Sequence, residues 1–198
     1  MDDGRWVGDM EAHNYERSSY DSCVYFKKYA DGDYVFMLLY VDDILIASKN
    51  MKHVSELKAL LGSEFEMKDL GEAKKILGME IDRNRLKCTL SISREGYLSK
   101  LLGTFNMDQS KLVLMPVGIH FKLRSATDEE AKSQYESMRA VPYQSVVGSL
   151  MYAMIGTRPD LAHSIGLVCR FMSKPLKEHW QGVKWVLRYI QGSLKRKL

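Results

Sequence analysis

Two adjacent aspartates, Asp42 and Asp43, lie between the apolar segments that begin at Tyr34 and Ile44. Neighbouring carboxylates repel each other unless a cation or hydrogen-bond donors offset their charge. Mg²⁺ is a common cation in this role, because it binds one or two carboxylates together with phosphate oxygens. Two such ions, about 4 Å apart, stabilise the attacking and leaving oxygens in phosphoryl transfer. The pair therefore predicts a phosphate-handling metal site, and two exposed acids in an ordinary turn are the alternative.

The segments on both sides of the aspartates have the composition of β-strands. Residues 34–41 form the longest apolar run and are apolar on both faces, which is typical of a central strand in a covered sheet. Residues 44–47 resume the run, and an Asp-Gly turn separates it from an earlier strand over residues 23–28. We therefore expect a hairpin with Asp42 at its bend, whose rigid strands hold both carboxylates in place.

The remainder of the chain changes from strands to helices. Asn50 and Ser93 are each expected to cap a helix with an apolar stripe. Thr157 is expected to cap a third helix, with Pro159 in its first turn. Further elements are strands over residues 65–70, 75–82 and 88–92, a linker with at most one helix over 108–142, and helices over the last third. This order predicts an α+β body followed by a helical appendage.

The composition is that of a globular protein, with 45% hydrophobic and 27% charged residues. It excludes disordered and collagen-like classes. The three cysteines form no CxxC pair, which argues against a disulfide scaffold and a zinc ribbon. The N-terminus is acidic, and the longest apolar run is far too short for a membrane span. We therefore expect no membrane contact and a location inside the cell, in the cytoplasm or the nucleus.

Positive charge is concentrated at the C-terminal end. Between residues 170 and 198, eight Lys and Arg residues stand against one Glu, although the net charge of the whole chain is only +4. A basic segment on a near-neutral body is typical of a surface that faces nucleic-acid phosphates. A solvated helix face with a basic tail is the equally weighted alternative, because Lys-rich helix faces are common.

The sequence around the aspartates, Tyr40-Val41-Asp42-Asp43, resembles the polymerase active-site hairpin of reverse transcriptases. Other segments resemble the copia-type LTR retrotransposon Pol polyprotein, in the same order along the chain, from about His13 to the end. They are residues 20–25, 65–71, 76–81, 147–152, 157–160 and 186–192. The resemblance implies a partial reverse-transcriptase palm, with an antiparallel sheet and helices, followed by a helical thumb and connection segment.

The resemblance also implies roles for individual residues. Asp42 corresponds to the main ligand of two catalytic Mg²⁺ ions, and Asp43 to a supporting ligand. Tyr40, with Val41 beside it, corresponds to the tyrosine next to the primer terminus and the incoming nucleotide. The partner that this implies for the complete enzyme is an RNA or DNA primer–template.

A second group of residues is implied to contact nucleic acid. Leu77, Gly78 and Met79 resemble the primer grip, which holds the primer backbone, and an ordinary strand with a glycine bulge is the alternative. Three basic residues of the helical region are further candidates, with helix-surface or packing roles as the alternative. They are Arg158, Lys184 and Arg188.

Compared with the family, the sequence contains no Met-Asp-Val-Lys-like segment with the third catalytic aspartate. The expected segments are a partial palm over residues 1–92, a thumb-like helix and linker over 93–142, and a connection segment over 143–198 that would precede RNase H. With two carboxylates instead of three, we expect a polymerase fragment that is inactive alone and self-associates through exposed sheet edges. The alternative is a non-catalytic or domesticated remnant that binds nucleic acid through its basic C-terminal helices.

Overall fold

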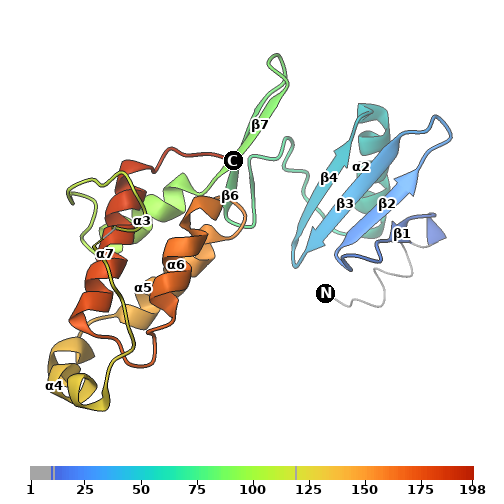
Figure 1. Cartoon of the computed structure of the whole chain (residues 1–198). Coiled ribbons are helices and arrows are strands. Elements are labelled where there is room, and N and C mark those ends of the chain that lie inside the picture. The colour runs from blue at the N-terminus through green and yellow to red at the C-terminus, as the bar shows by residue number, and fades with distance from the viewer. Residues whose placement is uncertain (1–9, 11, 119) are drawn as a thin grey trace. The chain divides into compact units, whose positions relative to one another are not determined.

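The computed structural model describes residue 10, residues 12–118 and residues 120–198. Contacts divide the chain into two compact units, residues 1–76 and residues 77–198 (Figure 1). Antiparallel strands dominate the described part of the first unit, and helices dominate the second. The α+β prediction is therefore confirmed. No helix in the described part of the chain is long and apolar enough to cross a membrane.

The first unit contains one four-stranded antiparallel sheet and helix α2. The strands lie in the order in which they occur in the sequence: β1 (Glu16–Arg17), β2 (Val24–Lys28), β3 (Tyr34–Tyr40) and β4 (Asp43–Ser48). Helix α2 (Met51–Glu64) follows, and its N-cap is Asn50, whose side chain accepts a hydrogen bond from the Lys52 amide, as predicted. The short strand β5 (Lys75–Ile76) ends the unit.

Alternation along β3 decides which face of this sheet is covered. Val35 and Met37 are fully buried and belong to one cluster with Leu57 and Leu61 of α2. Phe36 lies between Val35 and Met37, so its side chain points to the opposite face, and it is 47% exposed. Helix α2 thus covers one face only, and within the described residues the expected covering of both faces is not found.

The second unit consists of a β-hairpin and a helical bundle. Its elements are β6 (Met79–Asn84), β7 (Thr89–Ser93), α3 (Glu95–Thr104), α4 (Asp128–Arg139), α5 (Tyr143–Met154), the 3₁₀ helix η1 (Pro159–Leu161), α6 (Ala162–Cys169) and α7 (Lys177–Gly192). Helices α3, α5, α6 and α7 share one core, centred on buried side chains such as Leu102, Leu150, Ile165 and Leu187 (Figure 1). The helical spacing of these apolar residues made this core predictable.

Four local predictions are corrected by the structure. Residues 65–70 are not a strand, and the strand expected over residues 75–82 is interrupted by a turn at Leu77 and Gly78. Ser93 does not cap α3, because its hydroxyl donates to Glu80. Glu80 itself, from the neighbouring strand, accepts the Gly96 amide in the first turn of that helix. Thr157 does not cap a helix either, and the residue before η1 is Arg158.

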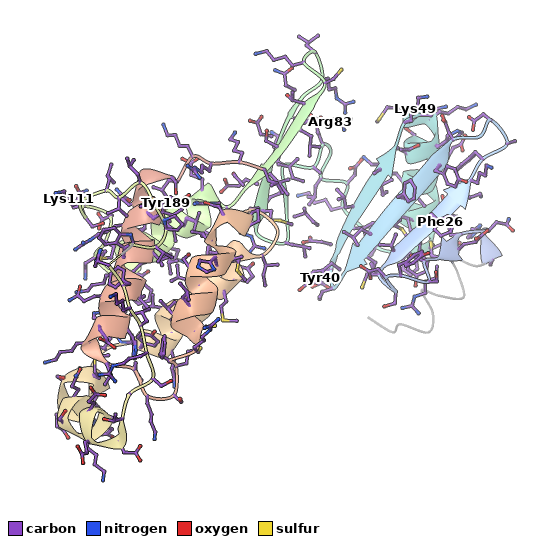
Figure 2. All side chains as sticks on the ribbon, viewed as in Figure 1. Phe26, Tyr40, Lys49, Arg83, Lys111 and Tyr189 are labelled. Atoms are coloured by element: carbon purple, nitrogen blue, oxygen red, sulfur yellow. The ribbon has the colours of Figure 1, made fainter. Side chains whose placement is uncertain are left out.

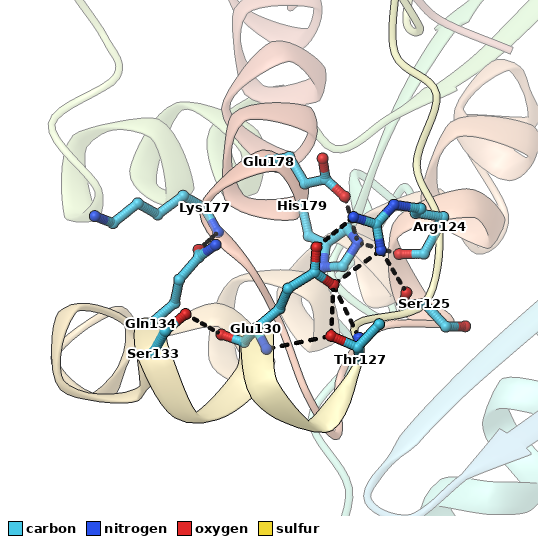
Figure 3. A network of polar contacts seen from close by, with 9 residues as sticks. All are labelled: Arg124, Ser125, Thr127, Glu130, Ser133, Gln134, Lys177, Glu178 and His179. Atoms are coloured by element: carbon cyan, nitrogen blue, oxygen red, sulfur yellow. Dashed lines mark hydrogen bonds and ion pairs between the residues drawn. The ribbon is translucent and has the colours of Figure 1, made fainter.

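Helix α4 and the preceding linker are attached to α7 by a polar network (Figure 3). Thr127 and Glu130 form a reciprocal capping box at the start of α4, and Arg124 forms an ion pair with Glu130. The Arg124 carbonyl accepts a hydrogen bond of 2.8 Å from Nε2 of His179, which is fully buried and stacked on Phe171. The linker therefore depends on one neutral imidazole in α7.

We expect the helical unit to lose stability between pH 7.5 and pH 5.5 because of His179. Its Nδ1 accepts the Leu176 amide, so a second proton there would face a donor. Burial lowers the pKa of His179 below 6.5, with Glu178 and Arg124 as the charged neighbours. The unfolded chain therefore binds a proton that the folded chain rejects, and stability falls as the pH drops below about 6.5.

The measurement is urea unfolding at the two pH values, followed by tryptophan fluorescence. The variant His179→Gln should flatten the pH dependence, whereas His163→Gln, at an exposed position of α6, should retain it. Equal pH dependence in His179→Gln and the unmodified chain would contradict the prediction.

Candidate active site and nucleic-acid contacts

Asp42 lies at the bend of a tight hairpin, as the sequence predicts. The last register pair of β3 and β4 is Tyr40 with Asp43, which leaves only Val41 and Asp42 in the turn. Register partners point to the same face, and Tyr40 alternates with the inward-facing Leu39. Tyr40, labelled at the end of its strand in Figure 2, and Asp43 therefore lie on the face opposite α2. The hairpin thus places one carboxylate in the turn and one beside an exposed aromatic ring.

Val41 is held in a backbone conformation that β-branched residues rarely adopt. Its φ is +53°. The residue is 70% exposed, so the burial of its side chain does not offset the free-energy cost of this conformation. Two-residue hairpin turns need a positive φ because this matches the twist of the strands. Glycine or asparagine normally supplies that angle. Strain at an exposed valine beside two acids is typical of a functional site rather than of a structural turn.

We expect the substitution Val41→Gly to stabilise the sheet unit by about 1 kcal/mol, because glycine adopts a positive φ without strain. The measurement is hydrogen exchange of the β3 and β4 amides at equilibrium. The control is Val35→Gly, at a fully buried position of the same strand, which should instead destabilise the unit. Faster exchange in Val41→Gly than in the unmodified chain would contradict the expected relief of strain.

Both carboxylates of the hairpin are exposed to solvent. Neither the Asp42 nor the Asp43 carboxylate has a hydrogen bond or ion pair with any residue that the structure describes. They also do not belong to a group of three potential metal ligands within the described residues. Two unpartnered carboxylates in adjacent positions are the donor set that Mg²⁺ takes from a protein when phosphate oxygens complete its shell. The hairpin therefore fits the ion that the sequence predicts, with two protein ligands.

The residues that resemble a primer grip form a second turn, which lies in the helical unit. Leu77 and Gly78 have φ values of +51° and +72°, and Met79 begins β6. A Cβ atom on Gly78 would lie 2.9 Å from the Tyr152 hydroxyl, so only glycine fits without displacing that ring. The expected role of these three residues stays a prediction, but they form a partly exposed turn that leads into β6 rather than a continuous strand.

Arg158 occupies a different environment from the one a nucleic-acid contact needs. Its side chain is 1% exposed, and its guanidinium donates two hydrogen bonds of 2.9 Å to the Asp160 carboxylate. It also donates to the Ser193 hydroxyl and carbonyl, at 2.8 and 3.2 Å. Tyr189 donates to the same carboxylate at 2.8 Å. Arg158 therefore joins the start of α6 to the end of α7 and has no surface to offer to a phosphate.

Lys184 and Arg188, the other two basic candidates, lie one turn apart on α7. Both are half-buried, and neither forms an ion pair with a residue in the described part of the chain. They are separated from the hydrophobic stripe of α7, where Val183 and Leu187 are buried in the bundle core. The two cations thus form a short, partly covered row without ion-pair partners among the described residues, which keeps them as candidates.

The structure also brings together a group that the sequence analysis did not identify. His53 of α2 lies 2.7 Å from Asp31 (Nε2 to Oδ2), and Asp33 is close enough for all three to offer ligand atoms within 4.8 Å. The Asp33 amide and His53 hold the pKa of Asp31 below its usual value. Asp31 and His53 are separated by 22 positions, so no motif signals this contact. The hydrogen bond attaches the β2–β3 turn to the first turn of α2.

Comparisons with known proteins identify the family of the sequence that contains the hairpin. The family model described as reverse transcriptase (RNA-dependent DNA polymerase) matches residues 7–119, which include both turns. The chain is 45% identical over 184 residues to the retrovirus-related Pol polyprotein from transposon TNT 1-94 of Nicotiana tabacum, and 33% identical over 159 residues to that from transposon RE1 of Arabidopsis thaliana. These matches cover 93% and 80% of the chain but only 14% and 10% of the two polyproteins.

A further relative is a yeast protein. The putative transposon Ty5-1 protein YCL074W of Saccharomyces cerevisiae is 30% identical over 84% of the chain and 52% of its own length. No solved structure matches the chain. Because the family model covers more than half of the residues, the chain belongs to the reverse transcriptase (RNA-dependent DNA polymerase) family, as part of the reverse transcriptase region of a copia-type retrotransposon Pol polyprotein.

Proposed function

We propose that the chain supplies the metal-binding hairpin and the primer-backbone turn of an RNA-directed DNA polymerase. The observation that carries the proposal is the strained Val41 turn, which presents two unpartnered carboxylates on a rigid hairpin. A structural turn of this kind would use glycine, and it would not retain two repelling charges. The expected partner is an RNA or DNA primer–template in the cytoplasm or the nucleus.

Asp42 and Asp43 are the residues that would hold Mg²⁺, and the ions would supply charge neutralisation at the transferring phosphate. The contribution of the chain is positioning: β3 and β4 fix the two carboxylates, because the two strands are paired as far as Tyr40 and Asp43 at the tip. Tyr40, 51% exposed on the open face of the sheet, offers a ring on which a base or sugar can stack.

A two-metal site needs more protein ligands than the described hairpin offers. Asp2 and Asp3 lie outside the described residues and precede no apolar strand in the sequence. With two carboxylates, the chain would bind an ion weakly and would not clamp a pair of ions for catalysis. We therefore propose that the isolated chain does not extend a primer. Primer extension with Mg²⁺ and all four dNTPs, if it were sensitive to Asp42→Asn, would contradict this.

Metal binding at the hairpin can be tested by paramagnetic broadening of NMR signals with Mn²⁺, a substitute for Mg²⁺. We expect Mn²⁺ to broaden the amide signals of residues 40–44 in the unmodified chain and not in Asp42→Asn. The group of Asp31, Asp33 and His53 serves as an internal reference, because its response to Mn²⁺ should be the same in both chains. Equal broadening at residues 40–44 in both chains would contradict the proposed site.

A second candidate function is non-catalytic binding of nucleic acid by α7. The uncompensated Lys184 and Arg188 favour it, together with the excess of basic residues after position 170. Binding through phosphates should weaken steeply with salt, should fall in a Lys184→Gln/Arg188→Gln variant, and should not change in Asp42→Ala.

Self-association through the edge of β4, which pairs only with β3 among the described strands, is a separate proposal. Sedimentation at increasing chain concentration tests it.

A further inference from the structure

We infer that Arg94 is a positioning residue for the turn at Leu77 and Gly78, and that Tyr152 of α5 is its partner in this role. The inference rests on the proposed function in one respect: it takes the turn as the contact to the primer backbone. Arg94 precedes α3 and Tyr152 lies near the end of α5, so both are distant from the turn in sequence. All of these residues belong to the helical unit.

Arg94 contacts the turn directly, through its guanidinium. Nη2 donates a hydrogen bond of 3.3 Å to the Leu77 carbonyl, and Nη1 donates to the Tyr152 carbonyl. The guanidinium carbon lies 4.1 Å from the centre of the Tyr152 ring, which is a cation–π distance. One planar group thereby connects the turn to α5, because its two terminal nitrogens donate to two different carbonyls.

Tyr152 holds the turn from the other side. Its hydroxyl donates to the Leu77 carbonyl at 3.4 Å and occupies the space that a side chain on Gly78 would need. The Tyr152 ring is fixed in turn by an edge contact with Tyr97, at 5.0 Å between ring centres. The Leu77 carbonyl therefore accepts hydrogen bonds from two side chains, both anchored in the helical bundle.

The turn needs such external support for a physical reason. Leu77 has a φ of +51°, and a left-handed conformation costs a non-glycine residue about 1 kcal/mol or more. Leu77 is only half-buried and Gly78 is exposed, so core packing does not supply that free energy. Arg94, in contrast, is 4% exposed, and burial of a charge is costly unless hydrogen bonds satisfy it. Both hydrogen bonds of this buried arginine go to backbone carbonyls, so the side chain fixes the positions of those carbonyls.

Two further contacts hold β6, the strand that follows the turn. Glu80 accepts from Ser93 and from the Gly96 amide, which fixes β6 against the start of α3. The Met79 sulfur would lie 3.0 Å from a Cβ on Gly156, so the loop after α5 also packs against β6. Loss of Arg94 should therefore release the turn while β6 stays in place.

The test compares Arg94→Met with Arg83→Met in the full chain. Arg83 is an exposed residue of β6 with no contact to the turn, so it controls for the loss of one positive charge. Hydrogen exchange by mass spectrometry reports on peptides that cover residues 74–80, and fluorescence anisotropy reports affinity for a primer–template duplex. Tyr152→Phe, which removes only the hydroxyl, provides a milder second variant.

In Arg94→Met we expect exchange at residues 74–80 to accelerate on the order of tenfold, the change that loss of one charge-assisted hydrogen bond gives. Exchange in α7 should be unchanged, and duplex affinity should fall more than in Arg83→Met. Tyr152→Phe should accelerate exchange at the turn by a smaller factor.

Two results would overturn the inference. One is unchanged exchange at residues 74–80 in Arg94→Met. The other is an equal acceleration in α5 and α7, which would make Arg94 a general stabilising residue of the bundle. If the unmodified chain binds no duplex, the proposed function fails, and the exchange data alone then decide the role of Arg94.

Discussion

Substitution of Asp42 by asparagine should abolish most nucleotide incorporation in a copia-type polymerase whose active-site hairpin is replaced by residues 24–48 of this chain. We expect a loss of about 10³-fold in kcat, the upper range for removing one preorganised electrostatic group. Asparagine preserves size and one oxygen ligand but removes the negative charge that retains the ions. Primer–template affinity should change little, because the ions act on the reacting phosphate. Single-turnover incorporation with saturating duplex measures this difference.

The matched control is Asp33→Asn in the same chimera. Asp33 lies in the turn before β3, at the opposite end of that strand from Asp42. It removes an identical charge from the same segment, so incorporation should stay within about a factor of two. Asp42→Asn with more than a tenth of the original rate, or an equal loss in both variants, would contradict a metal-ligand role for Asp42.

Substitution of Asp160 by alanine should lower the free energy of unfolding of the helical unit by about 3 kcal/mol, the cost of leaving a buried charge without its partner. Arg158 would remain in the interior, where it would lose both carboxylate hydrogen bonds. Tyr189 would lose its acceptor as well. Trp180 and Trp185 both lie in this unit, so urea unfolding followed by tryptophan fluorescence measures the change.

The control for this prediction is Asp128→Ala, which removes an ion pair with Lys174 at the surface and should have little effect. Arg158 holds the pKa of Asp160 below 3.8, so the ion pair should stabilise the unit fully at neutral pH, and this contribution should be lost only as the pH falls below 3.8. A double variant, Arg158→Met/Asp160→Ala, should recover part of the loss. Equal destabilisation by Asp128→Ala and Asp160→Ala would contradict the role of the buried pair.

The sequence alone determined the features that depend on neighbours along the chain. The hairpin around Asp42 was predictable because two short apolar segments flank one pair of acids, and few residues remain for the turn. Helix α2, with its cap at Asn50, was also predictable from neighbours along the chain, because Asn50 directly precedes an apolar stripe with helical spacing. The spacing of apolar residues also indicated the helical core, because a period near 3.6 places them on one face.

The tertiary structure alone decided which partner each polar group takes. Arg158 and Lys184 are both basic residues of the helical region, and the sequence does not distinguish them. The tertiary structure does, because it buries Arg158 against Asp160 and Ser193. Ser93 is of a residue type that often caps helices, but the Gly96 amide in the first turn of α3 donates to the Glu80 carboxylate of β6 instead.

The turn at Leu77 and Gly78 depends on Arg94 and Tyr152 in the same way, since Arg94 and Tyr152 are 58 positions apart. Periodic patterns record whether a residue is buried, because burial repeats with the local geometry of a helix or strand. The partner of a charged or polar side chain is determined only when segments that are distant in the sequence pack together, and a single sequence does not show which segments those are.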